Sequence, residues 1–321
     1  MISNKKYIKV LSSPAAKVEA EVNVNNQDIT ITQNGNYQAE PPYTGFGLVK
    51  VDVPAPKYYG IPAANWAMLE TAETGTPNFA GLTQIYQGFC NNRFDGAENL
   101  IGIANFDTIT TIHSTGLGGA FARTKLTGIS FANVLRVHSY GLDYTFNECE
   151  NLTGNVSFPS LVNIQASDEC CFQGTFSYTS IQSASFSALT TIAAPQAFVY
   201  CFEESLLEDI NFESLQSVTG DYAFNAAFVQ TSLTNVSFPS LTTITGEGAF
   251  SYAFDSANLQ SLSFPVLTTV ASEDKGIFDS MLENINNCTV HFPAALQATI
   301  GNWTSVQNGF GGSGTTVLFD L

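Results

Sequence analysis

The feature that most constrains this chain is a phenylalanine that returns at nearly constant intervals over two thirds of its 321 residues. Nine such anchors are separated by 25 to 28 residues: Phe79, Phe106, Phe131, Phe158, Phe186, Phe212, Phe238, Phe264 and Phe292. Apolar residues hold the same places around each anchor, as Leu233 and Val236 do before Phe238. Self-similarity at such a period predicts a solenoid, in which each repeat buries its apolar edge against its neighbours.

Each repeat is expected to contribute one short strand and one helical turn. In the strand, apolar residues two positions apart, such as Val236 and Phe238, face inward together. In the turn, aromatic residues four positions apart, such as Phe172 and Phe176, share one face of a helix. Coils stacked at a strand spacing of about 4.8 Å give a stack of about 40 Å. The 25 phenylalanines then form ladders in its core.

The motif of the repeat, L-x-x-V-x-F-P-x-L-x-x-I followed by Ala-Phe pairs, is specific enough to suggest a family. Its clearest matches are Phe158-Pro159, Phe238-Pro239, Phe264-Pro265, Phe292-Pro293, Ala223-Phe224 and Ala249-Phe250. This motif resembles the BspA-type leucine-rich repeat of bacterial surface proteins. The repeats depart from it at Ala184, which fills an aliphatic position, at Val134, and in extra residues before Phe106 and Phe158. We expect these departures to loosen only the local pairing.

The expected fold class is α+β and β-rich: a leucine-rich-repeat solenoid of about nine coils with a small N-terminal β domain. Residues 1–53 lack the repeat and contain alternating stretches at 17–24 and 28–32, then the turn signal Asn34-Gly35 and a further expected strand at 46–53. The segment Pro54-Ala55-Pro56 then interrupts the chain. We predict a β attachment domain (1–53), a linker (54–57), an N-terminal cap (58–78), the solenoid (79–292) and a C-terminal cap (293–321). The C-terminal cap is expected to contain an apolar helical stretch, a Gly-rich loop at 309–314 and a last strand at 316–321.

Charge narrows the range of partners. The chain has 28 acidic and 11 basic residues, a net charge of -17, which would repel nucleic acid and anionic lipid surfaces. No secretory signal is recognised in Met1–Leu11, and no apolar run is long enough to span a membrane. The six cysteines lack metal spacing and are predicted to be buried thiols, with Cys149 and Cys201 in one repeat position, two repeats apart.

Catalytic, cofactor-binding and metal-binding residues are not predicted. His113 and His138 fall at the same place in consecutive repeats and should stack as a surface ladder, while His291 has no evident partner. The run from Gly116 to Gly119 lacks the Lys or Ser of a phosphate cradle. The acidic residues Glu203, Glu204, Glu208, Asp209 and Glu213 favour a solvated face over a calcium site.

The outward side of the strands offers a binding face instead. A small polar residue precedes most of the phenylalanine anchors, as Ser237 and Ser263 do. This face lacks aromatic platforms and so favours packing against another protein, or affinity that resides in loops. The candidate binding residues are Glu208, Asp209, Asn211, Thr234, Asn235, Ser237, Gln260 and Ser263.

Function is expected to be binding or assembly without catalysis or cofactor. The segments Asp28–Tyr37, Tyr43–Phe46 and Val49–Val53 resemble a short β module of phage virion proteins and related gut-bacterial surface proteins. With no signal peptide recognised, this resemblance favours a virion component that is adhesive or structural. The alternative is a bacterial cell-surface adhesin of the BspA type. In either case the partners are proteins, such as an assembly or a host-surface receptor, with homo-oligomerisation left open.

Overall fold

The computed structural model describes residues 83–85, 87–92, 94–97 and 100–321, together with the backbone of four N-terminal strands. These strands form two antiparallel pairs: β1 (Lys6–Val10) with β2 (Val18–Val22), and β3 (Ile29–Ile31) with β4 (Tyr37–Ala39). Strands β2 and β3 fall in the two alternating stretches that predicted strands. The strand expected near Phe46–Val53, the linker, the N-terminal cap and Phe79 lie outside the described residues.

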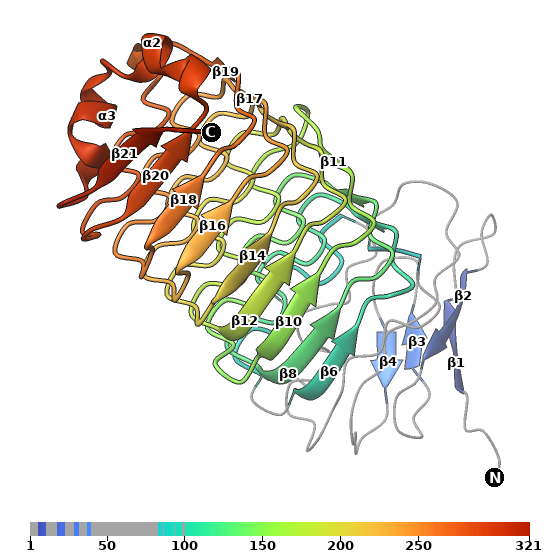
Figure 1. The fold of residues 1–321 in the computed structure, drawn as a ribbon. Helices are drawn as coiled ribbons and strands as arrows, with labels where there is room; N and C mark the ends of the chain where they lie inside the picture. Colours follow the sequence, from blue (N-terminus) through green and yellow to red (C-terminus); the bar gives the residue numbers. More distant parts are fainter. Residues whose placement is uncertain are drawn as a thin grey trace.

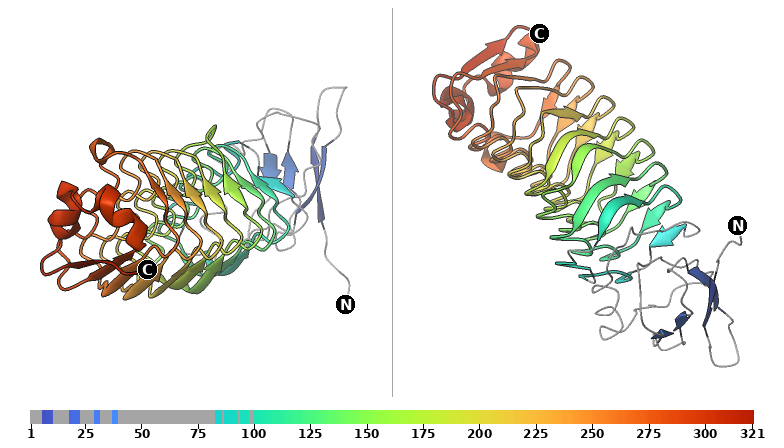
Figure 2. Two further views of the ribbon diagram at one scale, coloured as in Figure 1. Left: turned by 45° about the horizontal axis from the view of Figure 1, so that its top comes forward. Right: turned by 90° about the horizontal axis from the view of Figure 1, so that it is seen from below.

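One strand of each coil lies on the same side of the stack, where Figures 1 and 2 show these strands side by side. They are β6 (Ile101–Asn105), β8 (Lys125–Ser130), β10 (Thr153–Ser157), β12 (Ser180–Ser185), β14 (Asp209–Asn211), β16 (Asn235–Ser237), β18 (Ser261–Ser263), β20 (Thr289–Phe292) and β21 (Thr316–Phe319). They pair in parallel in the orders β6-β8, β10-β12-β14 and β16-β18-β20-β21. Successive repeats therefore stack as a parallel β-solenoid, which confirms the predicted fold class.

A second, shorter strand in each coil was not predicted. These strands are β5 (Gln84–Ile85), β7 (Thr111–Ile112), β9 (Arg136–Val137), β11 (Asn163–Ile164), β13 (Thr191–Ile192), β15 (Ser217–Val218), β17 (Thr243–Ile244) and β19 (Thr269–Val270). They pair in parallel from coil to coil in two sheets, in the orders β5-β7-β9 and β11-β13-β15-β17-β19. A two-residue strand is too short to show an alternating pattern, so periodicity alone does not reveal it.

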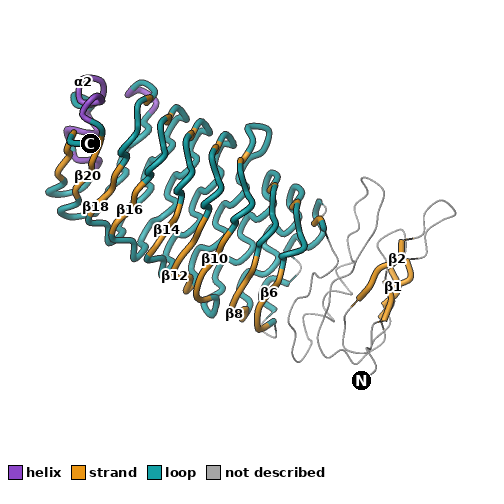
Figure 3. Tube along the Cα trace, turned by 45° about the vertical axis from the view of Figure 1, so that its right-hand side comes forward, coloured by secondary structure: helices purple, strands orange, loops and turns teal. Residues whose placement is uncertain are grey.

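The helical turn predicted for each repeat is wrong. The aromatic pairs lie in a spiral of tight turns, drawn as loop in Figure 3, with a left-handed residue at every fourth position. Cys170, Gly174 and Tyr178 have φ angles of 48°, 53° and 56°. Between them, Phe172 and Phe176 are both fully buried. A spiral with a period of four places residues i and i+4 on one side, as a helix does, so the spacing of the rings could not distinguish the two structures.

Backbone hydrogen bonds explain why the spiral is stable without a helix. The N–H of Phe172 donates to the carbonyl of Ala197 in the next coil, at 2.8 Å, whereas the N–H of Thr175 donates back to Phe172 within its own coil, at 3.3 Å. The N–H groups thus alternate between the next coil and the same coil. The turns are thereby tied from coil to coil as firmly as the strands are.

Three phenylalanine ladders fill the centre of the stack, as predicted. The anchors from Phe106 to Phe292 are buried, and the ring centroids of consecutive anchors lie 4.6 to 5.9 Å apart. The turn segments supply the other two ladders. One comprises Phe94, Phe121, Phe146, Phe176, Phe202, Phe228 and Phe254, and the other Phe172, Phe198, Phe224, Phe250 and Phe278.

The strand pairing is irregular after two glycines. The register shifts by one residue after Gly102 and Gly154, and in each case the additional residue stands on the partner strand, Thr127 on β8 and Gln182 on β12. These shifts are therefore not the extra residues expected before Phe106 and Phe158. The two glycines have φ angles of 80° and 79°, a conformation that glycine adopts at little cost. Ala184 is buried in its aliphatic position.

All six cysteines are free and buried, as predicted. The shared repeat position assigned to Cys149 and Cys201 is wrong. Cys149 lies three residues after Phe146, whereas Cys201 directly precedes Phe202, and these two phenylalanines belong to one ladder.

The C-terminal segment continues the stack. Strand β21 pairs with β20, and the ring of Phe319 stacks on Phe292 with centroids 5.8 Å apart. Between these strands lie the short helices η2 (Ala294–Leu296), α2 (Gln297–Ile300), α3 (Thr304–Gln307) and η3 (Gly309–Gly311), and the preceding coil contains η1 (Glu273–Lys275). The apolar helical stretch predicted in the C-terminal cap is thus two single-turn helices, with Ile300 and Val306 buried.

Candidate binding faces

The predicted strand-face residues lie on three neighbouring coils. Asp209 and Asn211 are on β14, Asn235 and Ser237 on β16, and Ser263 on β18. Glu208, Thr234 and Gln260 come just before these strands. Glu208, Asp209, Thr234, Asn235, Ser237 and Gln260 are exposed, whereas Asn211 and Ser263 are half-buried. The structure therefore brings all eight residues onto one surface, which we call the strand face.

Several polar groups of the strand face are held by hydrogen bonds within it. The Ser263 hydroxyl donates to Ser237 Oγ at 2.8 Å, across the pair that β16 and β18 form. Asn211 Oδ1 accepts the N–H of Glu213 at 2.7 Å. Such bonds fix the side chains before a partner arrives, which lowers the entropy lost on binding.

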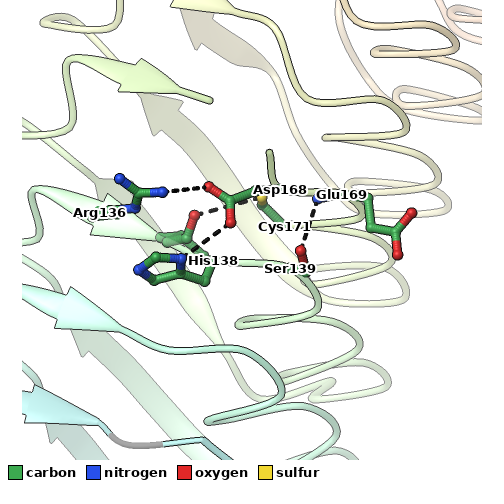
Figure 4. A network of polar contacts seen from close by, with 7 residues as sticks. Arg136, His138, Ser139, Asp168, Glu169 and Cys171 are labelled. Carbon is green, nitrogen blue, oxygen red and sulfur yellow. Dashed lines mark hydrogen bonds and ion pairs between the residues drawn. The ribbon is translucent and has the colours of Figure 1, made fainter. Parts of the chain in front are cut away.

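The histidine ladder is present, with an acidic partner that sequence reasoning missed. The rings of His113 and His138 are stacked, with centroids 5.1 Å apart and planes 6° apart. Asp168 accepts from His138 Nδ1 and from Arg136 Nη2, both at 3.1 Å (Figure 4). Asp168 lies 30 residues after His138, in a connection that is longer than in most other repeats, so repeat spacing gave no signal of it.

This network ties coils together and lacks the parts of a catalytic site. The side chain of Asp168 is only 5% exposed, and its carboxylate accepts from both Arg136 and His138. His113 Nε2 lies 2.9 Å from Gln84 Oε1 in the preceding coil, and burial, then the charges of His138 and Arg136, lower the pKa of His113. The nearest thiol, Cys171, is buried and its pKa is raised by burial, so it is no thiolate nucleophile.

The expectation that His291 has no partner is wrong. His291 Nδ1 lies 3.0 Å from Asp320 Oδ1, just after the last strand. This pair depends on the parallel pairing of β20 with β21, which brings residues 291 and 318 together. The repeat motif ends before β21 and so could not predict that neighbour.

The acidic residues near position 208 do not form one patch. Glu203 and Glu204 lie in a turn segment, whereas Asp209 belongs to β14. Among the described residues, no group of three or more histidine, cysteine or acidic side chains could hold a metal ion. In the same part of the chain, no helix is long and apolar enough to cross a membrane.

Aromatic residues are exposed on the turns, which the repeat pattern did not predict. Tyr144, Tyr178, Tyr200, Tyr222 and Tyr252 are 38–44% exposed. All five have left-handed backbone conformations, with φ between 47° and 56°. This conformation costs a non-glycine residue about 1 kcal/mol or more. The helical turns expected from the sequence would not place tyrosines in this conformation, because residues in a helical turn have negative φ.

One half-buried carboxyl on the turns makes stability depend on pH. Burial raises the pKa of Asp143 to about 7, and its Oδ1 is buried with no hydrogen-bond partner among the described residues. The unfolded pKa is about 3.9. Because the folded value is the higher one, the stability that this group contributes is complete below pH of about 4 and is lost as pH rises through about 7.

We therefore expect Asp143→Asn to raise the free energy of unfolding by about 1 kcal/mol at pH 8, after allowance for solvent screening of a partly exposed group. At pH 4 the variant and the parent should melt alike. Thermal melts at both pH values measure the effect. Glu148→Gln, which removes an exposed charge from the same turn, serves as the control. Equal melting temperatures of Asp143→Asn and the parent at pH 8 would contradict the raised pKa of Asp143.

The described coils define a class, the parallel β-solenoids built from leucine-rich-type repeats. The profile of the family described as BspA type leucine rich repeat region matches the chain in six copies, over residues 90–252 and 199–302. The chain belongs to this family, as the motif suggested. None of the curated proteins matches the sequence.

Proposed function

We propose that the protein is a non-enzymatic, protein-binding module that acts in adhesion at a bacterial cell surface. Its family is one of repeat proteins, whose scaffolds present extended surfaces to other proteins. The observation that carries the proposal is the strand face, where eight short or acidic polar side chains from three coils share one surface. Solenoids of this kind are typically interaction scaffolds and not enzymes.

The virion component expected first receives no support beyond the resemblance of residues 1–53, of which only strand backbone is described. The family match favours the surface adhesin. Immunoblots of washed cell surfaces and of purified phage particles separate the two. We expect the protein in the surface fraction, and its presence in particles alone would contradict the adhesin.

A pair of substitutions tests the strand face. We expect Ser237→Arg with Ser263→Arg to reduce the adherence of protein-coated beads to host-cell layers by about tenfold, because large charged side chains would block a small polar surface. The strand face has room for larger side chains at these positions, because the residue that pairs with Ser263 on the next strand, β20, is His291. Counts of bound beads measure the effect.

The matched control is Thr243→Arg with Thr269→Arg, which adds the same charge to the short strands β17 and β19 of these two coils. Arg136 on the short strand β9 lies farther along the same row of short strands. Adherence should stay at the parent level in this control. If both double variants lose adherence equally, added charge is the cause and the strand face is not the binding site.

A further inference from the structure

A row of tyrosines stands on the outer surface of the turn segments between residues 140 and 257, which we call the turn face. The spiral requires a left-handed residue at every fourth position, and glycine or asparagine meets that requirement at the lowest cost. Six tyrosines nevertheless occupy such positions: Tyr140, Tyr144, Tyr178, Tyr200, Tyr222 and Tyr252. Folding alone does not favour tyrosine there.

In the central row of the turn face, tyrosines alternate with small residues from coil to coil. The order along the stack is Gly119, Tyr144, Gly174, Tyr200, Ala226, Tyr252 and Ser280. The backbone N–H of each of the first six residues donates to a carbonyl oxygen in the next coil. That carbonyl belongs to the residue directly before the next member of the row. The tyrosines therefore recur every second coil, about 10 Å apart.

Two glycines make room for the tyrosine ring of the preceding coil, Gly174 in the central row and Gly248 in a neighbouring row. A methyl group on Gly174 would lie 2.3 Å from Tyr144 Cε1, and one on Gly248 would lie 2.4 Å from Tyr222 Cε1. The rings of Tyr144 and Tyr222 thus rest on the backbone of the following coil, while 38% and 39% of these residues stay exposed. An aromatic ring supported on one side and open on the other is a platform for a ligand.

The hydroxyl groups hold these platforms in place. Tyr222 donates to Glu247 Oε1 at 3.1 Å, and Tyr144 accepts from Gln173 Nε2 at 3.2 Å. The carboxylates of Glu203 and Glu204 surround Tyr178 and, with burial, raise its pKa. Because the rings are already fixed, binding a ligand would cost little further side-chain entropy.

Charge indicates the kind of ligand. The sequence contains no lysine or arginine between Arg136 and Lys275. The turn segments of this stretch carry the acidic residues Glu148, Glu203, Glu204, Asp221, Glu247 and Asp255. Among them, Glu247 has a cationic partner in Lys275 at 3.2 Å. Tyrosine faces set among carboxylates attract cations, and guanidinium groups above all, because these can both stack on a ring and pair with a carboxylate.

We propose that the turn face is a second docking surface, which takes an arginine-rich segment of a partner protein. The tyrosines stack on the guanidinium groups, and the neighbouring carboxylates pair with them. The surface lies on a different side of each coil from the strand face, so it can be occupied whether or not the strand face binds its own partner.

The test uses the full chain and a fluorescent peptide that consists of eight Arg-Gly repeats. Binding is measured by fluorescence anisotropy at pH 7.5 in 150 mM salt. We expect the triple variant Tyr144→Asn, Tyr200→Asn, Tyr252→Asn to bind at least about tenfold more weakly than the parent, since it loses three stacking sites without changing the net charge. Its melting temperature should equal or exceed that of the parent, because asparagine tolerates the left-handed conformation.

The matched control is Tyr144→Phe, Tyr200→Phe, Tyr252→Phe, which keeps the rings and should bind within about threefold of the parent. If the asparagine variant binds as tightly as the parent, net charge alone holds the peptide and the proposal fails. It also fails if the phenylalanine variant loses as much affinity as the asparagine variant. Bead adherence of the asparagine variant reports separately on the strand face, so the failure of one proposal leaves the other open.

Discussion

Replacing Phe238 with alanine is expected to lower the free energy of unfolding by about 3–5 kcal/mol. The ring is fully buried and stacks between Phe212 and Phe264, with centroids 5.9 and 5.4 Å away. The edge of Phe250 also meets it, at 5.3 Å. These neighbours belong to ladders fixed by the backbone of other coils, so they cannot move inward to fill the cavity.

The change in denaturant midpoint measures this loss. The control is Ser237→Ala, which alters the exposed residue next to Phe238 on the same strand and should shift the midpoint little. Equal shifts for both variants would mean that the assigned inward face of the strand is incorrect.

The second large effect is expected for Gly246→Ala, with a loss of about 3 kcal/mol or more. An added Cβ would lie 2.0 Å from the carbonyl oxygen of Gly220 in the preceding coil, and the same approach of 2.0 Å holds between Gly220 and Ala194 O. Backbone atoms that are hydrogen-bonded from coil to coil cannot shift to make room. The methyl group would therefore force the coils apart.

Melting temperature and far-ultraviolet circular dichroism measure the outcome for Gly246→Ala. Gly128→Ala is the control, because there the added Cβ would lie 3.2 Å from Cγ1 of Ile103, an exposed side chain that can turn away. If both alanine variants melt at the parent temperature, the coils are less tightly stacked at Gly246 than the structure shows.

The sequence predicted the repeated parts of the fold well. Anchors such as Phe238 show a period that only a stack of coils satisfies, and the stacking of His113 on His138 follows from counting repeats. Features that depend on conformation inside a repeat were not predicted. The spacing of Phe172 and Phe176 fits a helix and a four-residue spiral equally well. This spacing therefore could not predict the left-handed tyrosines.

The candidate sites also divide into residues that follow from their place in a repeat and residues that do not. The residues of the strand face that lie on strands, such as Asn235 and Ser237, could be chosen because every second residue of a strand points outward. Asp168 and Asp320 could not be assigned as histidine partners, because one lies in an insertion and the other beyond the last repeat of the motif. Irregular residues have no counterpart in other repeats from which their place can be read.

The hydrogen bonds that join coil to coil have a mechanical consequence for a protein held at both ends. They run along the axis of the stack, at the strands and at the turns alike. Tension along the axis therefore loads the coils in series, and the coil at one end can peel away before the next is strained. Each released coil of about 26 residues would add up to about 90 Å of extended chain. Such a stack would yield to a pull by lengthening stepwise, and a contact held by a coil farther along could survive the loss of several others.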